Sequence, residues 1–263
     1  MGRRVGRVVS SAVLCGAVAV ATVMASGSAT GAPVADGGIH PGVATHTAGA
    51  QCTSNFVFTD DKGIKYLGQA AHCSGTGQAT ETDGCTSQSL PIGTPVEIEG
   101  ASQPGTLVYN SWLAMQAAGE SDPDTCAYND FALVRVADAD QGKVTAGVPA
   151  IGGPSGIAAA PGVGQAVQSY GNSELRAGIS LLSPKVGTVT ANEGNGWSYT
   201  VLTATPGIPG DSGSGFLAGG QAFGVLSTLN FAPVPGTNGV SDLGRLLAYA
   251  SSHGAGGVRL VTA

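Results

Sequence analysis

The stretch Pro209-Gly210-Asp211-Ser212-Gly213-Ser214-Gly215 decides how the rest of this chain is interpreted. Its central serine, Ser212, lies between glycines and follows an acidic residue. Glycines allow the backbone to bend sharply and to approach a substrate carbonyl closely. The Ser212 hydroxyl can then project while the amides of Gly210 and Ser212 converge on one oxyanion. The stretch therefore indicates a nucleophilic serine, and the competing interpretation is a structural Gly/Ser turn.

A base and an acid for such a serine occur upstream. The base is His72, in Gln69-Ala70-Ala71-His72-Cys73, and the acid is Asp130, which precedes the apolar run 131–136. A serine hydroxyl is a weak nucleophile until an imidazole takes its proton, and a buried carboxylate holds that imidazole in the correct tautomer. The order His72, Asp130, Ser212 therefore predicts covalent acyl transfer, with a buried histidine and a turn aspartate as the bland alternatives.

These three segments together resemble the chymotrypsin/trypsin family of serine proteases, whose histidine, aspartate and serine boxes come in this order. Residues 168–173 resemble the segment that opens the family's second barrel, and residues 223–228 resemble the strand beside bound substrate. The resemblance can be followed over residues 52–250. The Ala/Gly/Val-rich, lysine-poor composition is closer to a secreted bacterial member of actinobacterial type than to an animal one.

The resemblance implies an all-β fold of two six-stranded antiparallel barrels with a C-terminal helix. The sequence agrees, because short β-branched and apolar runs alternate with Gly, Pro or Asp and helical periodicity is scarce. Only residues 241–252 show a helical spacing of apolar residues. The predicted strands are residues 55–59, 65–69, 95–99, 105–109, 131–136, 165–170, 186–190, 198–203, 215–217 and 222–227.

The first residues have the three-part pattern of a secretory signal peptide. A basic opening leads into the apolar stretch 8–25, and small residues follow through Ala32. We expect residues 1–32 to be removed, with cleavage after Ala29 or Ala32; an uncleaved membrane anchor is the alternative. The remaining chain divides into an N-terminal barrel, 33–150, and a C-terminal barrel, 151–263, connected by the low-complexity segment 149–164.

The charge balance narrows the set of partners. The formal net charge of the chain is −6, and loss of the signal arginines Arg3, Arg4 and Arg7 makes it −9. An acidic protein does not favour nucleic acid or anionic lipid. We expect a secreted, extracellular monomer that acts on protein or peptide, without stable membrane association after signal cleavage and without any metal or organic cofactor.

Cysteine usage agrees with an oxidising compartment. Outside the signal region the cysteines are Cys52, Cys73, Cys85 and Cys126, an even number that allows three pairings. No Cys-x-x-Cys pair of the kind that binds zinc occurs. The family resemblance implies that the cysteine after the histidine, Cys73, pairs with Cys52, which leaves Cys85 for Cys126.

The resemblance also assigns roles around Ser212. It implies an oxyanion hole made of the Gly210 and Ser212 amides. It further implies that Asp211 is not a catalytic acid but pairs with a cation that locks this loop. Arg176, in the loop after Tyr170, is the candidate cation, and a solvated loop arginine is the alternative.

Four residues are expected to contact substrate. In the family the floor of the primary pocket lies six residues before the nucleophile, which is Pro206 here, and no acidic residue occurs between Thr203 and Pro209. An entering Lys or Arg would be desolvated without a counter-charge, so trypsin-type cleavage is disfavoured. Ser227 lies on the substrate strand, and Thr228 and Leu229 form the pocket wall, so we expect preference for small or medium neutral residues.

The sequence thus predicts a secreted serine endopeptidase that uses Ser212 as nucleophile, His72 as general base and acid, and Asp130 to orient His72. The alternative is a catalytically silent binding protein on the same fold, since a fold alone does not guarantee activity. Retention of all three residues favours the enzyme.

Overall fold

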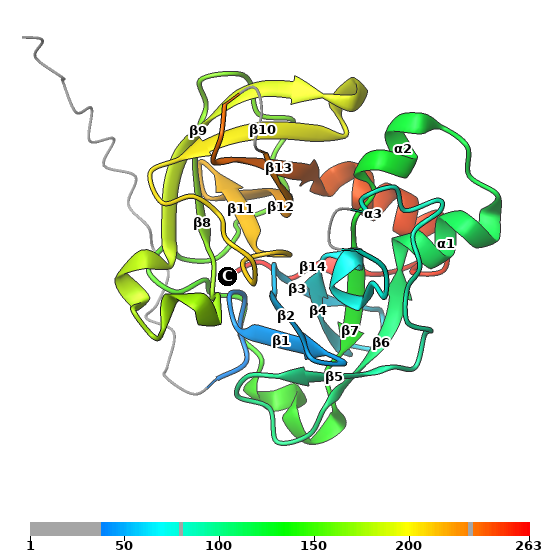
Figure 1. The fold of residues 1–263 in the computed structure, drawn as a ribbon. Helices are drawn as coiled ribbons and strands as arrows, with labels where there is room; N and C mark the ends of the chain where they lie inside the picture. The colour runs from blue at the N-terminus through cyan, green and yellow to red at the C-terminus, as the bar shows by residue number, and fades with distance from the viewer. Residues whose placement is uncertain (1–37, 79–80, 231–233) are drawn as a thin grey trace, which may run out of the picture.

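The structure is a computed structural model that describes residues 38–78, 81–230 and 234–263. The described strands form two antiparallel systems that lie side by side (Figure 1), one of eight strands and one a closed barrel of six. This confirms the predicted fold class. The predicted signal peptide, residues 1–32, lies outside the described residues. Among the described residues, no helix combines the length and the apolar character needed to cross a membrane.

The first system contains most of the N-terminal half. Its strand order is β14-β3-β4-β7-β6-β5-β1-β2, and its neighbouring strands are antiparallel. Strand β14, at the C-terminus, pairs with β3, so the end of the chain returns to this sheet. The strands are β1 (Ala44–Thr47), β2 (Ala50–Thr53), β3 (Val57–Thr59), β4 (Lys65–Gln69), β5 (Pro95–Ile98), β6 (Gly105–Asn110), β7 (Ala132–Arg135) and β14 (Arg259–Leu260).

The second system is a closed barrel with the order β10-β13-β12-β11-β8-β9. Its long strands β9 and β12 carry register shifts opposite their partners, which allow strands of this length to bend around the barrel. The strands are β8 (Ala166–Tyr170), β9 (Pro184–Glu193), β10 (Ser198–Thr203), β11 (Gly215–Ala218), β12 (Gln221–Asn230) and β13 (Thr237–Asp242).

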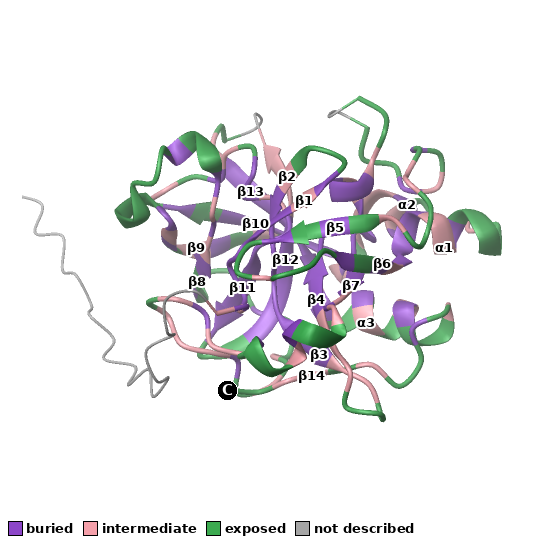
Figure 2. Ribbon diagram, turned by 90° about the horizontal axis from the view of Figure 1, so that it is seen from below, coloured by how far each residue is buried: buried purple, intermediate pink, exposed green. Residues whose placement is uncertain are grey.

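Alternation of apolar and polar residues along the strands gives each of the two strand systems a buried apolar interior. In β5, for example, Val96 and Ile98 are buried while their neighbours face solvent. Figure 2 shows the buried residues concentrated along the strands and the exposed ones on connecting loops. A separate cluster joins the two systems, with aromatic and aliphatic side chains from each half. It includes Phe56, Phe58, Phe131, Leu217, Val225, Leu243 and Leu246.

Three α-helices are present in the described chain, so the expectation of a single helix was wrong. They are α1 (Ser111–Ala118), α2 (Pro123–Tyr128) and α3 (Leu243–Ser252). The predicted C-terminal helix begins at Leu243 rather than Ser241, because the Asp242 side chain caps it by accepting from the amide of Arg245. Short 3-10 helices are η1 (Ala71–Ser74), η2 (Asp138–Lys143), η3 (Glu174–Arg176), η4 (Ser180–Leu182) and η5 (Gly194–Gly196).

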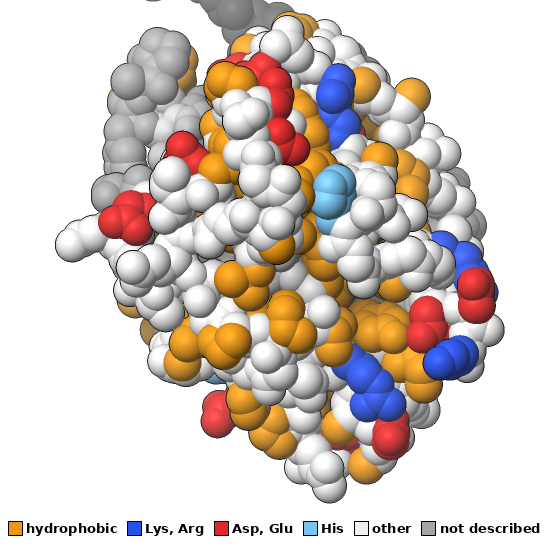
Figure 3. Space-filling model, turned by 90° about the vertical axis from the view of Figure 1, so that its right-hand side faces the viewer, with side chains coloured by type: hydrophobic (Ala, Val, Ile, Leu, Met, Phe, Trp, Pro, Cys, Tyr) orange, Lys and Arg blue, Asp and Glu red, His pale blue; other side chains and the backbone are white. Residues whose placement is uncertain are grey.

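Helix α1 was missed because it buries little of its surface, chiefly Trp112 and Met115, so its apolar pattern is weak. Its start is defined instead by Asn110, whose side chain accepts from the amides of Trp112 and Leu113. Helix α2 did carry a readable signal, since Asp122 followed by Pro123 is a typical helix start. On the side of the molecule where these helices lie, most of the visible surface is hydrophobic or uncharged, and several basic and acidic side chains lie next to one another toward one edge (Figure 3).

Candidate active site

His72 and Asp130 are joined by two hydrogen bonds. The imidazole Nδ1 of His72 lies 2.7 Å from Oδ2 of Asp130, and the backbone amide of His72 donates to the other carboxylate oxygen at 2.9 Å. His72 lies in η1 directly after β4, where Ala70 and Ala71 are fully buried. Small residues at these positions let the turn pack closely against the sheet. Both the position and the orientation of the ring are therefore fixed by Asp130.

Asp130 is held from both halves of the protein. On one side, the Ser111 hydroxyl donates to the carbonyl of Asn129 at 2.7 Å and accepts from the amide of Phe131 at 3.0 Å, which clamps the backbone on either side of Asp130. On the other side, the hydroxyl of Ser227 donates to Oδ2 of Asp130 at 2.5 Å. Ser227 was predicted to contact substrate, and the structure brings its side chain to the carboxylate.

The electrostatics of this pair suit proton transfer. Burial of the imidazole works to lower the pKa of His72, but the charge of Asp130 and its hydrogen bond outweigh this and raise it above 6.5. Burial works to raise the pKa of Asp130, but the charge of His72 and the hydrogen bonds from His72 and Ser227 bring it below 3.8. Asp130 therefore remains ionised at neutral pH and stabilises a positive charge on His72.

The loop that carries Ser212 packs against the segment that carries His72. The carbonyl of Ser212 accepts from the amide of Thr53 at 2.8 Å. Gly213 has a φ of +87°, and a Cβ there would come within 2.6 Å of the Thr53 carbonyl and 2.9 Å of the Ala70 amide. Only glycine fits such a site. The described hydrogen bonds of His72 do not include one to the Ser212 hydroxyl, and such bonds often tighten only with substrate bound.

Two amides in this loop have no acceptor among the described residues, and they are the predicted ones. The amides of Asp211, Gly213 and Ser214 donate to the carbonyls of Ile208, Leu226 and Asp211 respectively. Those of Gly210 and Ser212 form no hydrogen bond within the described chain. Buried loops normally satisfy their amides. A pair left free beside a serine is thus available to bind a negative oxygen.

Asp211 is fully buried and pairs with two cations. Its Oδ2 accepts from the guanidinium of Arg176, the candidate that the sequence suggested, and from the ammonium of Lys185 at 2.7 Å. Oδ2 also accepts from the amide of Ile208 at 3.1 Å, and Oδ1 accepts from the amide of Ser173 at 3.2 Å. Burial, assisted by Arg176, lowers the pKa of Lys185 in spite of Asp211. This network holds the Ser212 loop in place.

Lys185 was missed by sequence reasoning, because the apolar residues Val186 and Val189 of β9 lie on opposite faces of the strand and leave its inward face unmarked in the sequence. In β9 the buried Val189 and Lys185 are four residues apart, so a period of two places both side chains on the inner face of the barrel. A lysine at an inward position is rarely buried without a partner. Its partner in the structure is Asp211.

The predicted pocket residues lie near this network. The carbonyl of Pro206 accepts long hydrogen bonds from Lys185 at 3.4 Å and Arg176 at 3.5 Å. A Cβ on Gly207, the next residue, would lie 2.7 Å from Cδ2 of Leu229, so Leu229 packs directly over Gly207. The hydroxyl of Thr228 bonds to the Asn230 side chain at 3.4 Å. The structure thus brings Leu229 against Gly207, the residue after Pro206, and the role of these residues as a substrate pocket stays a prediction.

Both predicted disulfides are present. Cys52 pairs with Cys73, and Cys85 pairs with Cys126. The first joins β2 to η1, and therefore holds the His72 turn against β2, whose last residue, Thr53, donates its amide to the Ser212 carbonyl. Because all four sulfurs are bonded in pairs, they offer no thiolates for zinc.

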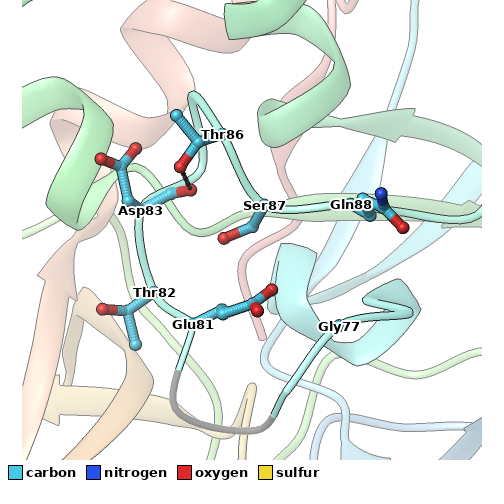
Figure 4. Close-up of a pocket in the computed structure, with 7 residues that line it drawn as sticks. All are labelled: Gly77, Glu81, Thr82, Asp83, Thr86, Ser87 and Gln88. Atoms are coloured by element: carbon cyan, nitrogen blue, oxygen red, sulfur yellow. Dashed lines mark hydrogen bonds between the residues drawn. The ribbon is translucent and has the colours of Figure 1, made fainter.

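A pocket lies in the loop that follows η1 (Figure 4). It contains two carboxylates, from Glu81 and Asp83, and the carbonyl of Asp83 accepts from the Thr86 hydroxyl at 3.4 Å. None of the predicted catalytic, oxyanion or substrate-binding residues lines it. The lining residues are Gly77, Glu81, Thr82, Asp83, Thr86, Ser87 and Gln88.

No protein-family model and no curated protein matches the sequence. Solved structures match it well. Protease A of Thermobifida fusca is 20% identical, covers 86% of this chain and 99% of its own length, and has a TM-score of 0.56. A Nocardiopsis protease is 21% identical over 84% of this chain and 98% of its own, with a TM-score of 0.52. Cellulomonas bogoriensis chymotrypsin is 24% identical over 86% and 99%, with a TM-score of 0.51. The chain therefore has the fold of the bacterial chymotrypsin-like serine proteases.

Proposed function

We propose that this protein is a secreted serine endopeptidase that cleaves peptide bonds through an acyl-enzyme. The observation that carries the proposal is the arrangement around Ser212: free amides of Gly210 and Ser212 flank the serine, and the neighbouring His72 is fixed and polarised by Asp130. A structural serine turn needs neither feature. The fold shared with serine proteases supports the proposal independently.

In the mechanism, His72 accepts the proton of the Ser212 hydroxyl as its oxygen attacks the scissile carbonyl. The Gly210 and Ser212 amides donate to the oxygen that becomes negative, and Asp130 stabilises the imidazolium. His72 then gives its proton to the leaving amine, which departs and leaves the acyl group on Ser212. Water, deprotonated by His72, hydrolyses this ester and restores the free serine.

The primary pocket supports a preference for small or medium neutral side chains before the cleaved bond. Leu229 occupies space over Gly207, and the cations Lys185 and Arg176 donate to the Pro206 carbonyl. A positively charged substrate side chain would find no free carboxylate there, because Asp211 already pairs with both cations. With the signal peptide, residues 1–32, removed, the enzyme comprises the barrels 33–150 and 151–263 and acts outside the cell as a monomer.

The test is reaction of the purified, disulfide-bonded protein with a fluorophosphonate, read by intact mass and peptide mapping. We expect one label per molecule at Ser212, absent from Ser212→Ala and strongly reduced in His72→Ala. Ser214→Ala, which alters the neighbouring buried serine, and His253→Ala, which alters a histidine at the end of α3, should keep the label. Labelled protein should also lose hydrolysis of casein and peptide amides.

A folded wild-type protein that takes no label and cleaves neither casein nor peptide amides would contradict the proposal. That result would favour a binding protein built on the protease fold.

A further inference from the structure

The peptide unit between Pro209 and Gly210 determines where one of the two free amides points. In a trans peptide the carbonyl oxygen and the amide hydrogen lie on opposite sides of the plane. Whatever holds the Pro209 carbonyl therefore also aims the Gly210 amide. If this plane rotated by half a turn, the carbonyl oxygen would occupy the place of the amide, and the site would repel a negative oxygen.

Ser173 holds that carbonyl. Its hydroxyl donates to the Pro209 carbonyl at 2.6 Å and accepts from the Leu175 amide at 3.2 Å. The side chain is in a buried position, with the residue 4% exposed. Its own amide donates to Asp211 at 3.2 Å, so Ser173 is itself fixed by the buried carboxylate. The hydroxyl has one proton to donate. Because it accepts from the Leu175 amide, that proton is available for the Pro209 carbonyl.

The next carbonyl along the loop is held from the opposite half. The hydroxyl of Thr53 donates to the Gly210 carbonyl at 2.8 Å, and the amide group of Gln51 approaches the same oxygen at 3.4 Å. Gly210 has a φ of +96°, and a Cβ on it would come within 2.0 Å of Gln51 and 3.0 Å of the Ser173 oxygen. Two successive carbonyls are thus restrained from two sides, with the free amide of Gly210 between them.

We propose that Ser173 is a positioning residue of the oxyanion site: its hydroxyl, bonded to the Pro209 carbonyl, keeps the Gly210 amide aimed at the substrate oxygen. This inference rests on the proposed function. Ser173 does not touch substrate, and it acts through the Pro209–Gly210 peptide. Its contribution belongs to the transition state, because the negative charge that the amide binds develops only there.

Ser173 also caps η3, which carries Arg176, so a purely structural role must be distinguished. Such a role predicts lower stability and a smaller active fraction. A positioning role predicts lower kcat per active molecule with unchanged KM, since ground-state binding does not use the oxyanion amides fully. It also predicts weaker binding of inhibitors whose bound form carries an oxyanion.

The chain offers a matched control in Ser54. This buried serine likewise donates to a carbonyl, that of His40 at 3.2 Å, and accepts from an amide, that of Gly42 at 3.1 Å. Ser54→Ala therefore removes the same kind of hydroxyl from the other half of the protein. Ser173→Thr retains a hydroxyl at the tested position.

The experiment compares wild type, Ser173→Ala, Ser173→Thr and Ser54→Ala in hydrolysis of one peptide amide, with active sites counted by fluorophosphonate. Loss of one restraining hydrogen bond corresponds to about a tenfold effect. We expect kcat of Ser173→Ala to fall about tenfold with KM within about twofold. The inhibition constant of a peptidyl trifluoromethyl ketone, which binds as a hemiketal oxyanion, should rise by the same factor. Ser54→Ala should keep the wild-type kcat per active site.

Unchanged kcat and inhibition constant in Ser173→Ala would overturn the inference while the triad stands. An equal fall in Ser54→Ala would also overturn it, since the effect would then be general destabilisation. Where Ser173→Ala does not fold, Ser173→Thr takes its place: an equal loss of kcat and of ketone affinity at unchanged KM would support the positioning role, and a loss of one without the other would overturn it. The proposed function is judged separately, on the wild type alone: if that protein neither labels nor hydrolyses, the inference fails with it.

Discussion

The carboxylate of Asp130 and the hydroxyl of Ser227 are 97 positions apart in the chain and meet at 2.5 Å. Asp130 precedes β7 of the first sheet, whereas Ser227 lies on β12 of the barrel. The same carboxylate oxygen is bonded to Nδ1 of His72 at 2.7 Å. The second barrel, which carries Ser212, therefore also acts on His72, because Ser227 stabilises the ionised carboxylate that holds the His72 ring.

Removal of the Ser227 hydroxyl should weaken catalysis without abolishing it. Hydrogen bonds to a charged group contribute about 1.5–3 kcal/mol, so Ser227→Ala should lower kcat/KM about tenfold or somewhat more. Ser241→Ala is the control, since this buried serine on the neighbouring β13 has no side-chain partner in the described structure. Steady-state kinetics on a peptide amide measure both. Equal activities of the two variants would show that the Asp130 contact is dispensable.

The His72–Asp130 pair predicts the acid limb of the pH profile. Only neutral His72 can accept the Ser212 proton, and Asp130 raises its pKa. Activity should therefore fall as pH decreases through a single pKa above 6.5, and Asp130→Asn should move this limb to lower pH. A profile of kcat/KM against pH, corrected for active sites, is the measurement. An unmoved limb in Asp130→Asn would contradict the assignment.

The same pair predicts a pH dependence of stability. A histidine whose pKa is raised by folding stabilises the folded protein fully below its unfolded value of 6.5, and that contribution is lost as pH rises through the folded pKa. His72→Ala should therefore have a lower free energy of unfolding than wild type at low pH. This difference should disappear as pH rises through the folded pKa of His72. Chemical unfolding of inactive Ser212→Ala with and without His72→Ala measures it, free of self-digestion.

Loss of the Asp211 carboxylate should destabilise the protein more than loss of one of its two cations. Asp211→Asn leaves Arg176 and Lys185 buried without a counter-charge, and breaking such a cluster costs about 3–5 kcal/mol of unfolding free energy. Lys185→Met should cost much less, because Asp211 still pairs with Arg176 and the new side chain is apolar. Urea unfolding in the Ser212→Ala background compares them. Equal losses would mean that Lys185 is required for the network.

Leu229 should limit the size of the residue before the cleaved bond. Leu229→Ala removes the side chain that packs over Gly207, and a change of this kind in an apolar pocket alters selectivity by at least about tenfold. We expect the ratio of kcat/KM for phenylalanine over alanine substrates to rise by that factor. Leu202→Ala, which alters a partly exposed leucine on the barrel wall, should leave the ratio unchanged. A peptide series differing at one position provides the test.

Loss of either disulfide should lower the free energy of unfolding, but only loss of Cys52–Cys73 should lower activity. Replacing Cys52 and Cys73 by alanine opens a loop of 21 residues, and replacing Cys85 and Cys126 opens one of 41. Chain entropy predicts losses of about 3 and about 4 kcal/mol. Only the first pair adjoins His72, so at a temperature where both variants are folded we expect kcat/KM to fall in the first alone.

Much of the architecture could be predicted from the sequence. Strands β4 and β10 have the predicted bounds, because Gly or Pro residues close to their ends interrupt the chain locally. Strand β14, by contrast, has only two residues and exists because the chain end returns to pair with β3. Helix α1 depends on a cap and a small buried face, which leave little periodic signal.

By itself the sequence determined the candidate chemistry: the order of His72, Asp130 and Ser212, the glycines around Ser212, and cysteines enough for two disulfides. These follow from residue types and local spacing, and both are written along the chain. Only the tertiary structure decided that Lys185 shares Asp211 with Arg176, that Ser227 bonds Asp130, and that Ser173 restrains the Pro209 carbonyl. Each of these contacts joins residues at least 26 positions apart. Their geometry arises when two packed sheets exclude water and bring buried polar groups together, a requirement that no local pattern contains.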